Sequence, residues 1–186
     1  LRAALEVLSA ALATKARAAW APLARDPAAV LDAAGPLAFS PSAGAQRAFL
    51  ERVLARHPTP QEELRALRLV ELERWRLKTL SRWTFEAGDP ARPNCVQALR
   101  CAVRALDLAA TLFGGGEADA LEKSFIEALA AAPSQGTSFS NAAAVFQRLA
   151  APGRSGPERL AAHAAAADHL AHEPGPVPVL PSSPSS

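Results

Sequence analysis

The chain has 186 residues, of which 49% are hydrophobic and 20% charged, and its 20 lysines and arginines nearly balance 18 aspartates and glutamates. This composition excludes a wholly disordered chain, which would be more polar and further from neutral. Alanine accounts for 45 residues, and no apolar run reaches the roughly 18 residues that a membrane span requires. The composition therefore favours a helical fold.

The first predicted element is an amphipathic helix over residues 1–20. Leucines at spacings of four and three residues form one face of it, namely Leu1, Leu5, Leu8 and Leu12. The first 25 residues also have the alanine- and arginine-rich composition of a transit peptide, but the leucine pattern favours a core helix. Because the sequence does not begin with Met, we expect a fragment of a larger protein or a subunit of a complex.

Two shorter elements are predicted before residue 59. A helical turn over residues 27–34 should end at Gly35 and Pro36, because proline and glycine interrupt helices. A helix over residues 45–56 follows, and its predicted buried face consists of Phe49, Leu50, Val53 and Leu54.

The strongest helix start in the chain is a capping box at Thr59 and Glu62, with Pro60 at the first helical position. The helix that it opens is predicted to run to residue 85. Apolar residues occur around most of its circumference, which is typical of a helix in the middle of a bundle. We therefore expect this helix to contact the most neighbours, or to leave one apolar face for a partner.

The most regular apolar pattern predicts a helix over residues 94–113, capped by Asn94 and ended by the glycines 114–116. Cys95 and Cys101 lie on it about 120° apart, so they are predicted to be two free buried thiols. Further helices are predicted over 117–132, 140–150 and 157–172. Residues 173–186 are rich in proline and serine, which indicates a disordered tail.

Residues 74–82 contain the clearest candidate binding site. Arg74, Lys78 and Arg82 recur every four residues and would share one face of the predicted helix. The stripe suits phosphates of a nucleic acid or an acidic partner, with a tryptophan available for stacking. The alternative is that the tryptophans are buried and the basic groups pair with acids in 117–127. The candidate residues are Arg74, Trp75, Arg76, Lys78, Arg82 and Trp83.

A second cluster lies near the end of the predicted helix 157–172, and its members are His163, Asp168, His169, His172 and Glu173. The spacing would suit zinc only if a further ligand came from elsewhere, and nothing in the sequence supplies one. The sequence also lacks a nucleophile elbow and a phosphate-binding loop. We therefore predict no catalytic residue, no cofactor and no metal site.

These patterns together predict an all-α protein. We expect an irregular helical bundle of six to eight helices, with a short α-solenoid as the second choice. Residues 1–172 would form one domain, best packed over 45–150. The predicted function is a non-enzymatic protein–protein interaction or scaffolding module in a reducing intracellular compartment, the cytoplasm or nucleus. The alternative is an anion or nucleic-acid binding module that uses the basic stripe.

Overall fold

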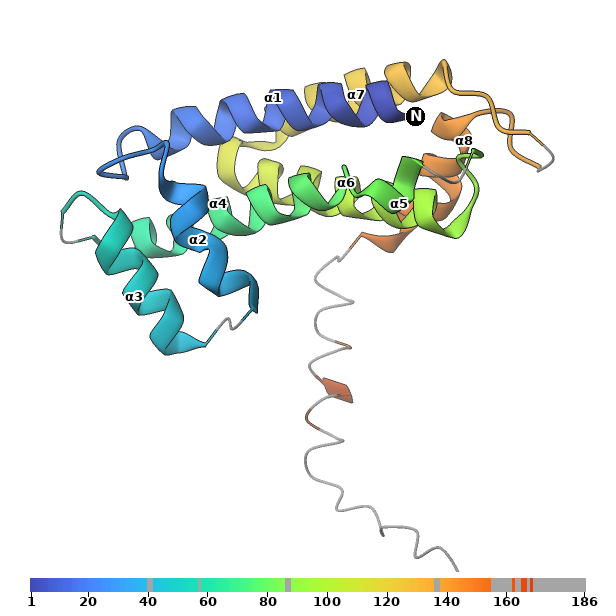
Figure 1. Ribbon diagram of the computed structural model, residues 1–186. Helices are drawn as coiled ribbons and strands as arrows, with labels where there is room; N and C mark the ends of the chain where they lie inside the picture. Colours follow the sequence, from blue (N-terminus) through green and yellow to red (C-terminus); the bar gives the residue numbers. More distant parts are fainter. Residues whose placement is uncertain are drawn as a thin grey trace, which may run out of the picture. The chain divides into compact units, whose positions relative to one another are not determined.

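The computed structural model describes residues 1–154 apart from 40–41, 57, 86–87 and 136–137, together with four helical positions, 162, 165, 166 and 168 (Figure 1). The prediction of an all-α bundle is confirmed, because the described residues form helices and no strand. Residues 1–154 form one compact unit, and residues 155–186 belong to another. The predicted helix 157–172 and the predicted tail fall almost entirely outside the described residues.

Four helices form the bundle. Of these, α1 (Arg2–Trp20) contacts α4 (Pro60–Lys78) and α7 (Gly115–Ala130), and α6 (Pro93–Phe113) contacts the same two helices. Each helix therefore has two neighbours in a closed ring, which is the arrangement of a four-helix bundle. The shorter elements are α2 (Val30–Phe39), α3 (Ala43–Val53), α5 (Arg82–Phe85), α8 (Ala142–Val145), a π-helical turn (Phe146–Ala150) and a 3-10 turn (Ala151–Gly153).

The most buried helix is α6, which also has the most extensive contacts with its neighbours. The helix starting at residue 60 is predicted to contact the most neighbours, and α4 does contact four other helices, α1, α2, α3 and α6, but α6 is more deeply buried. In α4 only Ala66, Leu69, Leu72 and Glu73 are buried, whereas Leu64 is 48% exposed and Leu77 is 51% exposed. The apolar residues around α4 therefore include some that no other described part of the chain covers.

The helix α2 corrects a second prediction, because it continues through Gly35 and Pro36 to Phe39. Pro36 cannot donate a backbone hydrogen bond, and this normally ends a helix. Gly35 relieves part of the steric conflict, since it has no Cβ to meet the proline ring. Burial of Val30, Ala34 and Leu37, at spacings of four and three residues, offsets the lost hydrogen bond.

The helix that starts at Pro60 ends at Lys78, seven residues before the predicted end at 85. The Thr79 hydroxyl donates to the Arg76 carbonyl at 2.6 Å. The Thr79 and Leu80 amides bond to carbonyls only three residues back, which tightens the last turn and stops the helix. The capping box of Thr59 and Glu62 at its start is confirmed.

Other helix ends differ from the predictions by a few residues. Asn94 lies inside α6, which begins at Pro93, so Asn94 is not its cap. Gly114 alone separates α6 from α7, with a φ of 99° that favours glycine, and the next glycine already begins α7. The predicted helix 140–150 is present as α8 and the π-helical turn, and Asn141 caps it by accepting from the Ala144 amide at 3.0 Å.

The helices α2 and α3 form a hairpin beside α4 (Figure 1). Its two ends meet where Ala24 and Leu54 form an isolated antiparallel bridge. The Arg25 amide donates to the Val53 carbonyl at 2.9 Å, and the Ala55 amide donates to the Leu23 carbonyl at 3.0 Å. We call this segment, residues 23–25 with 53–55, the neck of the hairpin.

No described helix is both long enough and apolar enough to cross a membrane. The residues of α1 belong to the same core as the rest of the bundle, with Leu5, Leu8, Leu12 and Trp20 all buried. The core also includes an edge-to-face pair between Phe125 of α7 and Phe146 of the π-helical turn, with ring centroids 5.5 Å apart.

Candidate functional site

The predicted basic stripe does not exist as one helix face. Arg74, Trp75, Arg76 and Lys78 lie on α4, but Arg82 and Trp83 lie on α5, after the turn at residues 79–81. Because the helix is interrupted, the four-residue spacing no longer places Arg82 above Lys78. The side chain of Trp83 is outside the described part of the structure, and Arg82 is exposed.

The most buried charges in this region are those of Glu73 and Arg76. Glu73 is 6% exposed, and it accepts from Arg76 Nε at 2.8 Å. Arg76 Nη1 also donates to the Ser9 hydroxyl of α1 at 2.9 Å. Arg76 therefore joins two helices of the bundle and is not available to a ligand.

A second group consists of Glu71, Arg74, Trp75 and Lys78. The Glu71 carboxylate accepts from Arg74 Nη1 at 3.2 Å and from the Trp75 indole N–H at 3.0 Å. The Lys78 ammonium lies 4.4 Å from the centre of the Trp75 ring, which is a cation–π contact. Lys78 forms no ion pair with any carboxylate in the described chain, so its charge is available at the surface.

The acidic stretch 117–127 does not neutralise these basic residues, which corrects the alternative interpretation of the sequence. Glu117 instead pairs with Lys15 of α1, and Glu122 pairs with Arg154 after the π-helical turn. The acids that pair with Arg74 and Arg76 are three residues earlier on the same helix. Ion pairs between residues three positions apart on α4 therefore neutralise Arg74 and Arg76, and α7 contributes no acid to these pairs.

An apolar groove of about 260 Å³ lies between α2 and the C-terminal half of α4. Its apolar walls are formed by Leu31, Ala34, Leu37, Val70 and Leu77. Leu31 is 43% exposed and Leu77 is 51% exposed, although both are large apolar side chains. Exposed apolar surface gathered in a groove and bordered by charges is typical of a binding surface.

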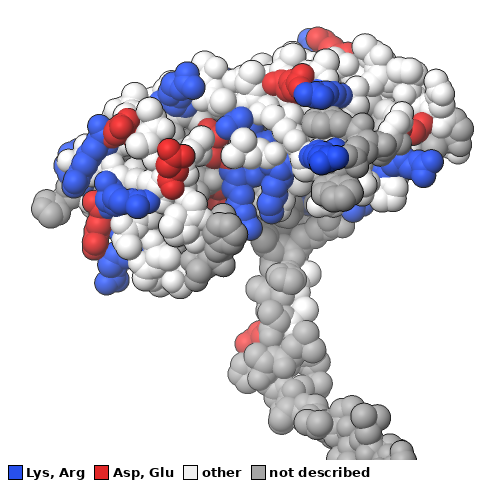
Figure 2. Space-filling view, viewed as in Figure 1, with Lys and Arg blue, Asp and Glu red and all other residues white. Residues whose placement is uncertain are grey.

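Charged residues border this groove along α4. Glu71, Glu73 and Arg74 line it, and Lys78 lies one helical turn after Arg74, beside the lining. Figure 2 shows lysine and arginine side chains gathered between α2 and α5, over the C-terminal half of α4. We call the α2–α4 groove, with Arg74 on its lining and Lys78 beside it, the basic-rimmed groove.

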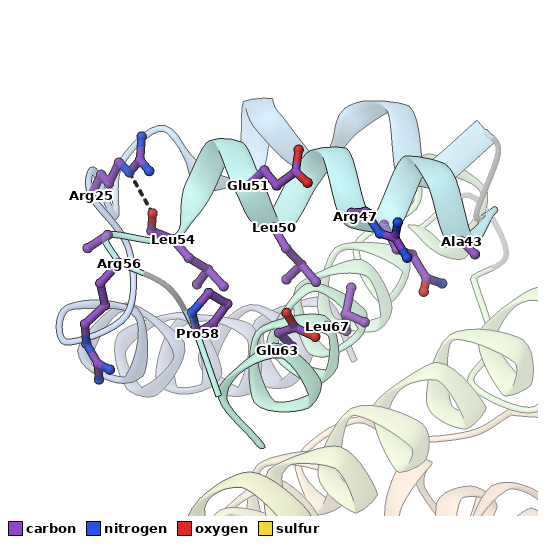
Figure 3. A pocket seen from close by; sticks show the side chains of 12 residues that line it. Arg25, Ala43, Arg47, Leu50, Glu51, Leu54, Arg56, Pro58, Glu63 and Leu67 are labelled. Atoms are coloured by element: carbon purple, nitrogen blue, oxygen red, sulfur yellow. Dashed lines mark hydrogen bonds between the residues drawn. The ribbon is translucent and has the colours of Figure 1, made fainter. Parts of the chain in front are cut away.

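A larger cleft, of about 790 Å³, lies between α3 and the N-terminal half of α4 (Figure 3). Its floor is apolar, with Leu50, Leu54 and Leu67. Arg25 Nε donates to the Leu54 carbonyl at 2.6 Å at one end, and Arg56 pairs there with Glu62. We call this feature the α3–α4 cleft.

The two cysteines are free and buried, as predicted. The Cys95 thiol donates to the Thr84 carbonyl at 3.3 Å, beside a third cleft of about 520 Å³. Burial raises the pKa of both the Cys95 and the Cys101 thiols, and the negative charge of Asp89 raises that of Cys95 further. A thiol kept protonated in this way is a poor nucleophile.

The described residues contain no group of three or more His, Cys, Asp or Glu side chains that could hold a metal. The predicted cluster of His163, His169, His172 and Glu173 lies outside the described residues, and Asp168 is an exposed helical position. Of the predicted binding residues whose side chains are described, only Arg74 lines the apolar groove. The sequence pattern did not identify Leu31, whereas the apolar residues around the helix that starts at Pro60 indicated that a residue such as Leu77 could be exposed.

A family model described as "Domain of unknown function (DUF3536)" matches residues 1–178 of the chain. No curated protein and no solved structure matches it.

Proposed function

The chain belongs to the DUF3536 family, and from that premise we propose that it is a non-enzymatic protein–protein interaction module that uses the basic-rimmed groove. The observation that carries the proposal is the exposure of Leu31 and Leu77, one on each wall of the groove. Exposure of both leucines costs free energy in water, which a partner that covers them would recover.

The shape of the groove favours a helical partner. Its two walls are the helices α2 and α4, and a third helix lying between two others can insert apolar side chains at spacings of three and four residues. Leu31 and Leu77 would then contact the apolar face of the partner. Ala34 and Gly35 on α2 are small, and no atom lies within 4 Å of a Cβ built at Gly35, so α2 leaves room there.

The charge on the rim favours acidic flanks on that partner. Lys78 has no carboxylate partner in the described chain, and Arg74 shares Glu71 with the Trp75 indole. An acidic residue beside the apolar face of the partner would pair with Lys78 and give the complex a salt-dependent association rate. We therefore propose an acidic amphipathic helix as the occupant of the groove.

The geometry gives less support to nucleic-acid binding. Arg76 is held by Glu73 and Ser9, and Arg82 is on a different helix from Lys78. Nucleic-acid binding surfaces usually place many unpaired basic groups along one face.

We further propose that the protein acts in a reducing compartment, which the free buried thiols Cys95 and Cys101 support.

The test is binding of two designed helical peptides of about 20 residues, long enough to form a helix. Both carry leucines at positions i, i+3 and i+7, and they differ only in having glutamates or lysines on the remaining face. We expect the acidic peptide to bind the full chain with a Kd of about 10–100 μM in a fluorescence anisotropy titration, and the basic peptide to bind at least tenfold more weakly.

Variants in the groove identify the site. Leu77→Ser and Lys78→Glu should each weaken binding of the acidic peptide at least tenfold. Leu64→Ser is the matched control, since Leu64 is 48% exposed on the same helix but lies more than three helical turns before Leu77, away from the groove. Equal binding of the two peptides, or equal effects of Leu77→Ser and Leu64→Ser, would refute the proposal. So would binding of single-stranded RNA with a steep salt dependence that Arg74→Ala/Lys78→Ala abolishes.

A further inference from the structure

The α3–α4 cleft has features that the basic-rimmed groove does not explain. The cleft has an apolar floor and a rim that carries both signs of charge. Arg47 and Glu51 come from α3, and Glu63 comes from α4 (Figure 3). None of these three side chains makes an ion pair with another described residue. A surface with unpaired charges of both signs around an apolar floor has the composition of an interface.

An exposed apolar side chain lies next to the cleft. Leu64 follows Glu63 on α4 and is 48% exposed, but it does not itself line the cleft. The cleft floor contains Leu50 and Leu54. Exposed apolar surface therefore occurs both in the cleft and beside it.

Such a surface is complementary to itself. In a two-fold symmetric interface, residue i of one subunit contacts residue j of the other, and j contacts i. Arg47 and Glu63 lie on opposite walls of the cleft (Figure 3). A two-fold axis placed so that Arg47 of one copy meets Glu63 of the other repeats this contact in the opposite direction.

We propose that the α3–α4 cleft is a self-association surface and that its occupant is a second copy of this chain. The two α3–α4 pairs pack against each other, and the dimer contains two equivalent Arg47–Glu63 contacts, one in each direction. This inference is independent of the basic-rimmed groove, because no residue that lines the α3–α4 cleft lines that groove.

Sedimentation equilibrium of the full chain from about 1 to 500 μM tests the proposal. We expect the average mass to rise from that of one chain to that of two, and the association to weaken with added salt, because exposed ion pairs are screened. Arg47→Glu and Glu63→Arg should each reduce the association constant at least tenfold. Neither side chain makes an ion pair in the described chain, so both variants should remain folded.

The decisive experiment mixes these two single variants. The Arg47→Glu copy then presents two acids and the Glu63→Arg copy two bases, so the mixture should dimerise at least tenfold more strongly than either variant alone. Arg65→Glu is the charge-matched control, because Arg65 is exposed on α4 outside the cleft. A chain that is monomeric at every concentration, or a mixture that stays monomeric, would overturn the proposal. Leu77→Ser should leave the dimer intact, which separates this result from the peptide-binding test.

Discussion

Glu73 and Arg76 form an ion pair within α4 that is largely enclosed by protein. The Arg76 guanidinium also donates to the hydroxyl of Ser9 on α1. The exposed fractions of the two side chains are 7% for Glu73 and 12% for Arg76. Taking two charges out of water costs several kcal/mol, which the pair recovers only while both members remain. Each partner therefore depends on the other.

We predict that Arg76→Ala lowers the free energy of unfolding by about 3–5 kcal/mol, because Glu73 is left as a buried charge without its partner. Arg74→Ala is the control on the same helix. The Arg74 side chain is 39% exposed and pairs with Glu71, so its loss should cost at most about 1 kcal/mol. Urea denaturation measures both values, and similar losses for the two variants would contradict the prediction.

The position of α6 in the core predicts a large effect of truncation there. Leu99 is fully buried, so Leu99→Ala should cost about 2–5 kcal/mol through lost burial and the cavity left behind. Leu64→Ala should change the stability of the monomer by no more than about 0.5 kcal/mol, because Leu64 is largely exposed. Thermal unfolding at low micromolar concentration compares the two, and a Leu99→Ala protein as stable as Leu64→Ala would show that α6 is not central.

The capping box at the start of α4 gives a third prediction. The Thr59 hydroxyl accepts from the Glu62 amide at 3.3 Å, so Thr59→Ala should cost about 1 kcal/mol. Thr59→Ser keeps the hydroxyl and should stay within a few tenths of a kcal/mol of the unchanged protein. Urea denaturation distinguishes the two substitutions. Equal losses for alanine and serine would assign the effect to the threonine methyl group and not to the cap.

Asp89 predicts a pH dependence. Its carboxylate accepts from the Ala91 amide at 2.8 Å, from the Gln135 amide and from the Ser134 hydroxyl at 2.9 Å. These hydrogen bonds, led by that of Ala91, hold the pKa of Asp89 below its usual value of 3.8. Since the folded pKa is lowered, the stabilisation is complete above the unfolded pKa and is lost as the pH falls through the folded pKa.

Asp89→Asn should therefore lower the Tm at pH 7, and the difference from the unchanged protein should shrink as the pH falls below about 3.8. Thermal unfolding of both proteins from pH 7 to pH 3 measures this difference directly. A difference that is constant across this range would show that the charge of Asp89 does not contribute to the contact between residue 89 and the segment 134–135.

The buried thiols predict slow chemical modification. Cys95 is 2% exposed and Cys101 is 4% exposed, and burial raises the pKa of both thiols. Ellman's reagent at pH 7.5 should modify neither in the folded chain, whereas both should react within minutes in denaturant. Rapid reaction of one thiol under native conditions would show that the helix α6 opens locally.

The helices could largely be predicted because their signals are local. The leucines of α1, the capping box of Thr59 and the stripe of α6 depend only on nearby residues, and the structure contains each of these helices. The end of α4 could not be predicted in the same way. At that end the Thr79 hydroxyl donates to the Arg76 carbonyl three residues earlier, and a threonine in the sequence does not reveal whether it will make such a bond.

The binding surfaces depend on contacts between distant segments, which the sequence does not reveal. Leu31 and Leu77 are 46 positions apart and line one groove because α2 packs beside α4. The charge of Arg74 is evident from the sequence but its partner is not, since the choice between Glu71 and the acids of α7 depends on helix packing. Tertiary packing therefore determines both which residues line the groove and which acidic residues pair with its basic ones.

The neck of the α2–α3 hairpin has a consequence for the modularity of the chain. Because the strandlike segments around Ala24 and Leu54 lie side by side, the chain leaves the four-helix bundle and returns to it at nearly the same point. A short loop is therefore long enough to join residues 25 and 53, but the hairpin also contributes Val30, Leu37, Phe49 and Leu50 to the common core. A substitution in the hairpin thus affects both the core of the bundle and one wall of each proposed binding surface.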